Sequence, residues 1–467
     1  MAIVGVRLRT QQSTNFKTNF GEREGTMSTA AMLTDMYEYT MVDAALRDGT
    51  AHRSCVFEVF TRHLPAGRRY GVVAGLGRII EYIKDFRPSE EELAFLRDNK
   101  IVSKETIEWL ENFHFSGTIR AYREGEMFFA NSPVVQVEGT FAQCTLLETV
   151  ILSVLNYDCA IASAASRITS AAGSRPCADM GGRRAHESAA IAASRSAVVG
   201  GFVSTANLAA AQRYGIPCIG TAAHAFTLVH DSEREAFESQ VAALGVNTTL
   251  LTDTYNVEEA IRTAVEVAGT DLGGIRIDSG DLASMAQKAR HQLDALGATS
   301  TKITVTNDLD EYAIAALATA PVDSYGVGTR LVTGSGHPTS SMVYKLVERE
   351  GNDGAMHPVA KKSFGKTTDG WRKRGLRAYE YGLAQGELVL AGSEQAVQSW
   401  TSDQYGDLKD LSIVAIDHGD IDESLTTREA LFAARNYHYE ALRELPVNAL
   451  SLSDGEQAIP TEVITVE

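Results

Sequence analysis

The sequence lacks the features that mark secreted, membrane-spanning or zinc-binding proteins. Its 5 cysteines are odd in number and include no Cys-x-x-Cys pair, which argues against a disulfide framework or a zinc cluster. Charged residues interrupt the most apolar region before it reaches the ~18 residues of a membrane span, and the N-terminus turns polar too soon for a signal peptide. We therefore expect a cytoplasmic protein with no membrane partner.

Positive charge is also scarce. The chain has 43 Lys and Arg against 60 Asp and Glu, a formal net charge of -17, and its basic residues are scattered. A protein that binds nucleic acid over a broad surface needs a basic patch, so we expect no nucleic-acid partner. An anionic ligand must instead be held by a local group of donors.

Apolar residues are plentiful. At 467 residues and 44% hydrophobic content, the chain exceeds the length that one core usually serves, which predicts two domains. The polar start reads as a tail, and the end of the chain is expected to return to the first domain. We predict a flexible tail over 1–33, an α+β sandwich domain over 34–140 plus 356–467, and a βα barrel over 141–355.

Short β-branched runs alternate with amphipathic helical segments in the second half of the chain. Helical segments such as 257–267, 282–296 and 309–317 separate the runs. Repeated βα units imply parallel strands, and their number favours an irregular barrel of the α/β class. The runs are Ile216 to Gly220, Thr248 to Thr252, Gly274 to Ile277, Ile303 to Thr306 and Ser324 to Val327.

Polar residues follow each of these five runs. In a parallel barrel such positions share the rim at the carboxyl ends of the strands, where active sites lie. Any one of them can be ordinary turn chemistry, but five together predict a site. The residues are Thr221 and His224, Asp253 to Tyr255, Asp278 to Asp281, Asn307 and Asp308, and Gly328 and Thr329.

The strongest chemical candidates lie in this set. Asp278 and Asp281 can bind Mg²⁺ or ribose hydroxyls, and Arg276 offers a fork to phosphate, although Ser279 or Asp278 can also be a helix cap. The amides around Gly328 and the Thr329 hydroxyl can hold a phosphate.

An isolated histidine is more often structural. The small neighbours of His224, however, leave it accessible for nucleophilic or acid-base work. Upstream, Arg183 and Arg184 follow a double glycine and can capture a carboxylate or phosphate, or can be surface charges.

Read together, the segments resemble the nicotinate phosphoribosyltransferase family, whose fold is a type II phosphoribosyltransferase. Single segments are short, but their order runs from Thr34 to about Lys366. They are Thr34-Asp-Met-Tyr37-Glu-Tyr-Thr-Met41, Phe57 to Arg62, Leu147 to Thr149, Gly200 to Asn207, Gly220-Thr-Ala-Ala-His224, Asp253-Thr-Tyr255, Arg276-Ile-Asp-Ser-Gly-Asp281, Gly326-Val-Gly-Thr329 and Tyr344 to Val347.

The resemblance implies an enzyme of NAD biosynthesis that makes nicotinate mononucleotide and pyrophosphate from nicotinate and phosphoribosyl pyrophosphate. It also implies Mg²⁺, ATP as a co-substrate that phosphorylates a histidine, and a homodimer with a shared active site. The implied catalytic residues are His224, which is also the phosphohistidine, Asp253 and Asp278, the last two also as metal ligands.

The implied substrate contacts come from the matching motifs. Tyr37 would stack on the pyridine ring across the dimer interface, and Arg183 would face the substrate. The remaining expected contacts, around the phosphoribosyl group and its 5-phosphate, are Arg167, Thr205, Arg276, Ser279, Gly328 and Thr329.

One segment departs from the family pattern. Relatives more often carry an aromatic residue after the acidic one where this chain has Asp179-Met-Gly-Gly182, and an Asp there is also a feature of nicotinamide-using relatives. A nicotinamide enzyme is therefore one alternative. A non-catalytic barrel that binds a phosphorylated ligand is another, but such a barrel would have no reason to keep His224, Asp253 and Asp278. A barrel lyase would need a lysine at a strand end; Lys345 and Lys302 are the nearest candidates, and Lys302 precedes its strand.

Overall fold

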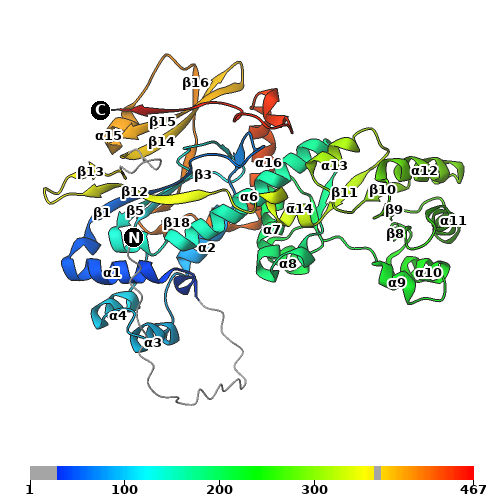
Figure 1. Ribbon diagram of the computed structural model, residues 1–467, viewed down its shortest axis with the longest axis horizontal. Helices are drawn as coiled ribbons and strands as arrows, with labels where there is room; N and C mark the ends of the chain where they lie inside the picture. The colour runs from blue at the N-terminus through cyan, green and yellow to red at the C-terminus, as the bar shows by residue number, and fades with distance from the viewer. Residues whose placement is uncertain (1–28, 362–369, 467) are drawn as a thin grey trace.

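The computed structural model describes residues 29–361 and 370–466. The chain forms a large mixed unit built from both of its ends and a narrower βα unit that projects from it (Figure 1). The predicted class, an α/β barrel joined to an α+β sandwich, is confirmed. The basic stretch after Lys361 and residues 1–28 of the tail predicted over 1–33 lie outside the described residues.

The sandwich is made of two sheets and a short ribbon. The larger sheet has the order β13-β12-β1-β5-β3-β17-β18, and the smaller has the order β16-β14-β15-β19. The strands of the larger sheet are β1 (Ser54–Thr61), β3 (Thr118–Tyr122), β5 (Val135–Thr140), β12 (Met342–Glu350), β13 (Met356–Pro358), β17 (Ser412–Asp417) and β18 (Asp420–Ile421). The others are β14 (Arg372–Glu380), β15 (Leu383–Gly392), β16 (Asp407–Asp410), β19 (Thr461–Thr465) and the ribbon pair β2 (Gly71–Val72) and β4 (Met127–Phe128).

The two faces of the larger sheet make different kinds of contact, one apolar and one ionic. One face, with Phe57 and Val137, packs on helices in an apolar core. The other contacts the smaller sheet through buried ion pairs, as where Lys373 Nζ lies 2.9 Å from Glu58 Oε2. Burial on both faces explains why β1 is buried along almost its whole length. The helices of this unit are α1 (Met36–Asp48), α2 (Leu76–Lys84), α3 (Glu90–Asp98), α4 (Lys104–Glu111), α5 (Phe141–Thr145), α15 (Glu394–Ser399) and α16 (Arg428–Arg443).

The second sheet is parallel and curled, with the order β7-β6-β11-β10-β9-β8. Its strands are β6 (Cys177–Asp179), β7 (Ser204–Thr205), β8 (Thr249–Leu251), β9 (Gly274–Ile277), β10 (Lys302–Val305) and β11 (Ser324–Val327). The helices of this unit are α6 (Glu148–Ala172), which also joins it to the sandwich, α7 (Glu187–Val199), α8 (Leu208–Tyr214), α9 (His224–Leu228), α10 (Glu233–Leu244), α11 (Val257–Ala268), α12 (Leu282–Ala295), α13 (Glu311–Ala316) and α14 (Thr329–Val332).

Local signals explain why these helices begin and end where they do. In α11 the Asn256 side chain caps the first turn, Gly269 ends the helix with a positive φ of 78°, and one face buries residues such as Ile261 and Ala264. The predicted run at 216–220 forms only an isolated bridge to Thr205. It borders β7 without becoming a named strand.

Two boundaries differ from the prediction. β12, expected within the barrel because it precedes 355, pairs antiparallel with β1 in the sandwich sheet, where Met342 and Tyr344 join the apolar core. Residues 29–33, expected in the tail, are packed: Ala31 is fully buried, and the Thr29 amide donates to Glu92 Oε1 at 2.7 Å.

The stretch 141–172, which contains α6, is long and apolar enough for a membrane span by length and composition. However, 67% of its apolar window is buried inside the protein, as in the central helix of a folded domain. α6 contacts both the sandwich and the parallel sheet. The stretch therefore serves as a core helix.

Candidate active site

The carboxyl ends of the parallel strands meet at one rim, and the predicted catalytic side chains lie there together. Asp253 follows β8, Asp278 follows β9 and His224 begins α9. His224 Nε2 is 3.9 Å from Asp253 Oδ1 and 4.0 Å from Asp278 Oδ2. The spatial convergence expected from the five strand ends therefore holds for these three residues.

The two carboxylates have different surroundings. Asp253 is almost fully buried, and its Oδ2 accepts hydrogen bonds from the Asp278 amide at 2.9 Å and the Ser279 hydroxyl at 2.6 Å. Its Oδ1 is buried without a hydrogen-bond partner among the residues described. The Asp278 side chain is 36% exposed, and its Oδ1 accepts from the Thr306 hydroxyl. One oxygen of each carboxylate is thus left facing His224.

The imidazole of His224 is half-exposed and fixed at one nitrogen. Its Nδ1 lies 3.1 Å from Thr254 Oγ1, while Nε2 faces the carboxylates. The small residues before it leave the ring open, as the sequence predicted. An imidazole held in this way can act as a nucleophile or as a proton carrier.

Arg276 pins the loop that carries the histidine. Its guanidinium donates to Thr221 Oγ1 at 2.7 Å and to the Ala222 carbonyl at 3.1 Å. Burial lowers the pKa of Arg276 below its usual value, although nearby Asp278 and Asp253 act in the opposite direction. Arg183 is exposed and lies close enough to influence Arg276 electrostatically.

The glycine-rich loop after β11 borders the same rim. A Cβ atom at Gly181 would lie 3.0 Å from the Gly328 carbonyl, so the 181–183 and 328–329 loops are neighbours. A Cβ atom at Gly326 would lie 2.6 Å from both Met180 and Thr306, so glycine is needed for this close approach. The Gly328 and Thr329 backbone therefore lies beside the loop that presents Arg183.

Three predicted substrate residues lie outside the His224 cluster. Tyr37 lies on α1, far from α9 in Figure 1, and is 43% exposed. Arg167 is buried on α6, where its Nε contacts Glu311 Oε1 at 3.1 Å beside Arg68. Thr205 is fully buried and donates its hydroxyl to Asp179 Oδ2 at 2.8 Å. Within this chain, the side chains of Arg167 and Thr205 are therefore engaged by the buried carboxylates of Glu311 and Asp179.

Asp179, the residue that raised the question of an amide substrate, has its carboxylate engaged inside the protein. Its Oδ1 accepts from the Gly181 amide at 2.8 Å, and its Oδ2 accepts from Ser194 Oγ at 2.6 Å as well as from Thr205. The side chain is buried. It therefore organises the loop that leads to Arg183.

Sequence reasoning gave no role to the hydroxyl residues around the cluster, although Thr254 lies within the predicted 253–255 segment and Thr306 ends a predicted run. Thr254 lies three residues after β8 and Thr306 directly after β10, and each hydrogen-bonds a predicted catalytic residue. Their position next to strand ends was the available signal. A threonine at a strand end is common enough that this signal is weak without coordinates.

The donor set at the rim fits a hydrated magnesium ion. No group of three or more His, Cys, Asp or Glu side chains suited to a metal occurs in the described residues. Mg²⁺ does not require one, because it binds through one or two carboxylates while waters and substrate phosphates supply the remaining oxygens. The buried, unpartnered Oδ1 of Asp253 and the half-exposed Asp278 could provide such ligands.

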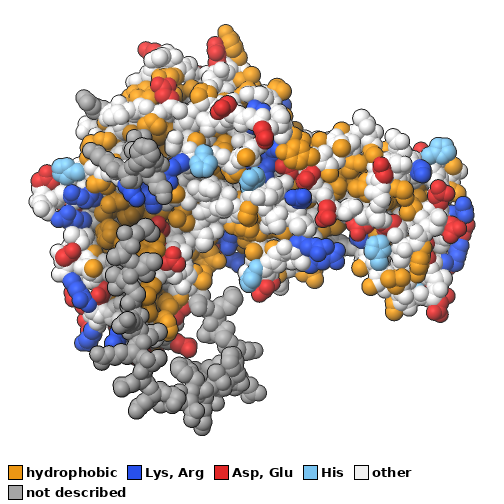
Figure 2. Space-filling view, viewed as in Figure 1, with side chains coloured by type: hydrophobic (Ala, Val, Ile, Leu, Met, Phe, Trp, Pro, Cys, Tyr) orange, Lys and Arg blue, Asp and Glu red, His pale blue; other side chains and the backbone are white. Residues whose placement is uncertain are grey.

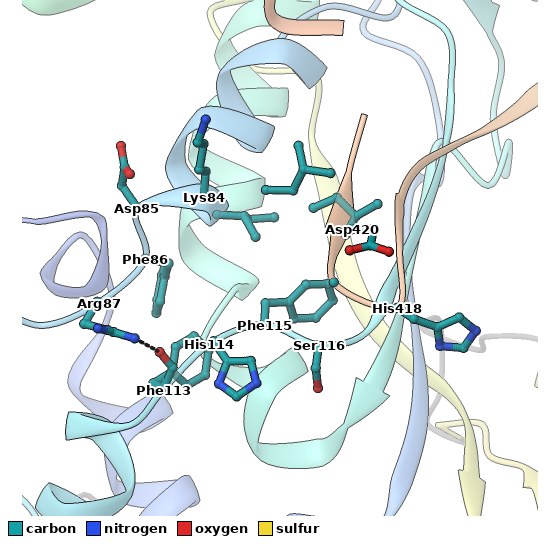
Figure 3. Close-up of a pocket in the computed structure, with 14 residues that line it drawn as sticks. Lys84, Asp85, Phe86, Arg87, Phe113, His114, Phe115, Ser116, His418 and Asp420 are labelled. Atoms are coloured by element: carbon teal, nitrogen blue, oxygen red, sulfur yellow. Dashed lines mark hydrogen bonds between the residues drawn. The ribbon is translucent and has the colours of Figure 1, made fainter. Parts of the chain in front are cut away.

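A separate cavity of about 720 Å³ lies in the sandwich, between the end of α2, the 113–116 segment and the β17–β18 hairpin. Figure 3 shows Lys84, Asp85, Arg87 and Asp420 around it, with Arg87 donating to the Phe113 carbonyl. Charges of both signs line the cavity, so it has no evident preference for a charged ligand. None of the predicted site residues lines it.

Comparison with known proteins extends over most of the chain. Residues 32–156 match the nicotinate phosphoribosyltransferase (NAPRTase) N-terminal domain, and residues 176–388 match the nicotinate phosphoribosyltransferase (NAPRTase) family. A nicotinate phosphoribosyltransferase of Mycobacterium tuberculosis, pncB1, is 50% identical over 444 residues, covering 93% of this chain and 95% of that protein. The nicotinate phosphoribosyltransferase of Bacillus subtilis is 37% identical over 375 residues, covering 78% and 76% respectively.

Solved structures agree with this assignment. The crystal structure of human nicotinic acid phosphoribosyltransferase aligns with a TM-score of 0.78 at 25% identity, covering 93% of this chain and 98% of that one. A nicotinate-nucleotide pyrophosphorylase from Pyrococcus furiosus, with a TM-score of 0.69 at 22% identity and coverage of 88% and 96%, shares the fold. The chain therefore belongs to the nicotinate phosphoribosyltransferase family.

Proposed function

We propose that this chain transfers the phosphoribosyl group of phosphoribosyl pyrophosphate to nicotinate, forming nicotinate mononucleotide and pyrophosphate in NAD salvage. The observation that supports this proposal most directly is the rim cluster of His224, Asp253 and Asp278 within a chain of this family. All five cysteines are free, which fits a reducing compartment, and we place the reaction in the cytoplasm.

The geometry suits a reaction in which pyrophosphate leaves the anomeric carbon of ribose. Positive charge grows on the sugar as the bond breaks, and carboxylates near that carbon stabilise it. Asp278, whose side chain is half-exposed at the end of β9, is placed for this role. The 328–329 amides would hold the 5-phosphate, and Ser279, whose hydroxyl donates to Asp253, would lie beside the ribose. Positioning two reactants in this way can contribute ~7–11 kcal/mol.

Magnesium, when bound, would neutralise the charge of the leaving pyrophosphate. Asp253 and Asp278 would be its protein ligands, since the buried, unpartnered Oδ1 of Asp253 and the Oδ2 of the partly exposed Asp278 both face His224. Arg276 and Arg183 add positive charge at the same rim. These groups act locally: Figure 2 shows both signs of charge scattered over the visible face of an acidic protein.

We also propose that ATP phosphorylates His224 and that hydrolysis of this phosphohistidine drives the transfer forward. Support comes from the exposure of the ring and from its fixed orientation against two carboxylates. An exposed imidazole beside anionic groups is a suitable phosphoryl acceptor once a cation screens those groups.

The active site is proposed to be shared between two copies of the chain. α1 exposes an apolar stripe consisting of Leu33 just before the helix, Met36, Tyr37 and Met41, although its opposite side is already buried. Isolated exposed apolar residues are common, but a stripe along one helix is typical of an interface. Docking of this stripe on a second copy would bring Tyr37 to a rim that it cannot reach within its own chain (Figure 1).

A direct assay tests the function. Purified protein is given phosphoribosyl pyrophosphate and Mg²⁺ with nicotinate or nicotinamide, with and without ATP, and mononucleotide is measured. We expect a strong preference for nicotinate, because Arg183 and Arg184 are exposed next to the rim while the Asp179 carboxylate is engaged internally. Equal turnover of nicotinamide would contradict the substrate assignment. No turnover of either base would favour a non-catalytic phosphate-binding barrel.

The same assay with His224→Ala tests the phosphohistidine. The variant is expected to lose ATP stimulation and to retain slow ATP-independent transfer, because the 328–329 loop and Asp278 remain in place. His230→Ala is a matched control, since His230 lies two residues beyond the other end of α9, where its Nδ1 is 2.7 Å from the Phe226 carbonyl. ATP dependence that survives in His224→Ala would refute the assigned nucleophile.

A further inference from the structure

The orientation of the His224 ring depends on one side-chain hydrogen bond. Nδ1 lies 3.1 Å from Thr254 Oγ1, and this is the hydrogen bond that the ring makes in the described part of the chain. The side chain is 41% exposed, and alanines flank it. Packing therefore does little to stop the ring from turning, so the hydroxyl has to fix it.

The Thr254 hydroxyl has no competing structural task. The helix that follows, α11, is capped by Asn256, whose side chain accepts from the Glu259 amide. The threonine two positions earlier, Thr252, uses its hydroxyl on the Arg276 carbonyl instead. Of the hydroxyls near the end of β8, the one on Thr254 is directed at the histidine.

The rest of the loop is already fixed by other contacts. Arg276 holds Thr221 and the Ala222 carbonyl, so the backbone leading to the histidine is anchored. Asp253 is anchored by the Asp278 amide and the Ser279 hydroxyl. Rotation of the imidazole about its own bonds is the freedom that remains, and it determines which nitrogen faces the carboxylates.

We propose that Thr254 is a positioning residue for phosphoryl transfer: by engaging Nδ1 it directs Nε2 into the site as the phosphoryl acceptor. This inference rests on the proposed ATP coupling. In the step, the Nε2 lone pair forms a bond to the γ-phosphorus of ATP, and the bond between that phosphorus and the bridging oxygen of ADP breaks. ADP leaves with the electron pair, and the Nδ1 proton stays hydrogen-bonded to Thr254 Oγ1.

The test compares three variants of the full chain. Thr254→Val removes the hydroxyl and keeps the shape, Thr254→Ser restores a hydroxyl, and Thr252→Val is the matched control on the same strand end. Each is incubated with ATP labelled at the γ-phosphate and Mg²⁺, and acid-labile label on the protein is followed with time. Mononucleotide formation is measured in parallel with and without ATP, and thermal melting checks folding.

We expect Thr254→Val to slow phosphoenzyme formation and ATP-stimulated kcat by roughly 10- to 100-fold, as loss of an orienting neighbour commonly does. The KM values for nicotinate and phosphoribosyl pyrophosphate, and the slow transfer without ATP, should stay near those of the wild type. Thr254→Ser and Thr252→Val should both label at close to the wild-type rate. Thr254→Ala repeats the test should the valine variant melt early.

Two results would overturn the proposal and are distinguishable. Normal labelling of Thr254→Val and Thr254→Ala, with a labelled wild type, would remove the role of Thr254 and leave the proposed function intact. A wild type that transfers phosphoribosyl groups without becoming labelled would remove the ATP coupling, and the role of Thr254 with it.

Discussion

The carboxylate of Asp179 accepts hydrogen bonds from one amide and two hydroxyls at the end of β6, and its side chain is 2% exposed. These contacts join β6 to α7 through Ser194 and to β7 through Thr205. An acceptor surrounded only by donors tolerates no added donor. The contacts of β6 with α7 and β7 at this part of the rim therefore depend on the two carboxylate oxygens of Asp179.

Asp179→Asn is expected to destabilise the protein by about 1–3 kcal/mol, because an amide NH₂ would face a donor that then loses its acceptor. The free energy of unfolding from urea titration measures this loss. Asp323→Asn is the control: that carboxylate also accepts at a strand, from the Ile303 amide, but is 33% exposed. Equal losses in the two variants would show that burial of Asp179 is not the cause.

The residues of the rim also show how much of the site can be predicted from the sequence. His224, Asp253, Asp278 and Arg276 were all predicted, because the parallel-barrel rule brings strand ends together whatever the intervening loops are. This rule predicts where a residue lies, but it does not predict which groups its side chain hydrogen-bonds. The Arg276 contacts to the His224 loop and the Thr254 contact to the ring depend on side-chain rotamers, which one sequence does not specify.

Elements differ in how strongly the sequence specifies them. α11 and α12 were predicted within a residue of their observed bounds, because their apolar spacing spans several turns. β6 and β7 have only three and two residues and carry no readable periodicity. The residues of β12 were placed within the barrel domain, since the partner strand β1 lies almost 300 positions away in the chain. Pairing between strands so far apart in the chain leaves no pattern in the local sequence.

α1 is attached to the rest of the molecule partly through a buried acid. Glu38 is fully buried, and its carboxylate accepts from the Thr149 amide at 3.1 Å and from the hydroxyls of Thr149 and Thr34. These bonds favour the ionised form, but burial outweighs them and raises the pKa to about 7 from an ordinary 4.5. The folded protein therefore keeps a proton that the unfolded chain releases.

The stability contributed by Glu38 should consequently be complete below pH 4.5 and should decline as the pH rises toward 7. Glu38→Gln is expected to be less stable overall, because its NH₂ faces donors, yet its deficit relative to wild type should shrink across that pH range. Urea titrations at intervals between the two pH values measure the difference.

Glu92→Gln provides a control of opposite sign. Burial acts to raise the Glu92 pKa, but hydrogen bonds from Ser89 and Thr29 outweigh it and hold the pKa below its usual value. Its contribution is therefore present above the ordinary pKa of 4.5 and is lost only as the pH falls below that value, so the deficit of Glu92→Gln should not shrink between pH 4.5 and 7. A deficit that changes with pH in the same direction for both variants would contradict the assigned protonation state of Glu38.

At the scale of the whole molecule, the two halves of the proposed substrate site lie at opposite ends. α1, with Tyr37, lies on the far side of the sandwich, and α9, with His224, lies at the end of the βα unit (Figure 1). Loop movements rarely span a molecule, whereas a twofold arrangement of identical chains can join such surfaces in pairs. The separation within one chain is therefore the strongest structural reason to expect a dimer.

Subunit complementation tests this arrangement without a structure of the dimer. Tyr37→Ala and His224→Ala are each expected to lose ATP-stimulated transfer, because each damages both sites of a homodimer. The two variants are then unfolded together and refolded, and about half of the dimers should be mixed. Each mixed dimer should contain one intact site, so activity should return to about a quarter of that of refolded wild type.

Met41→Glu, which places a charge in the exposed α1 stripe beside Tyr37, should shift the protein toward monomer, as measured by light scattering. It should also abolish the recovery of activity when it is added to both variants. Refolded mixtures that stay as inactive as the separate variants would show that Tyr37 and His224 do not serve one shared site.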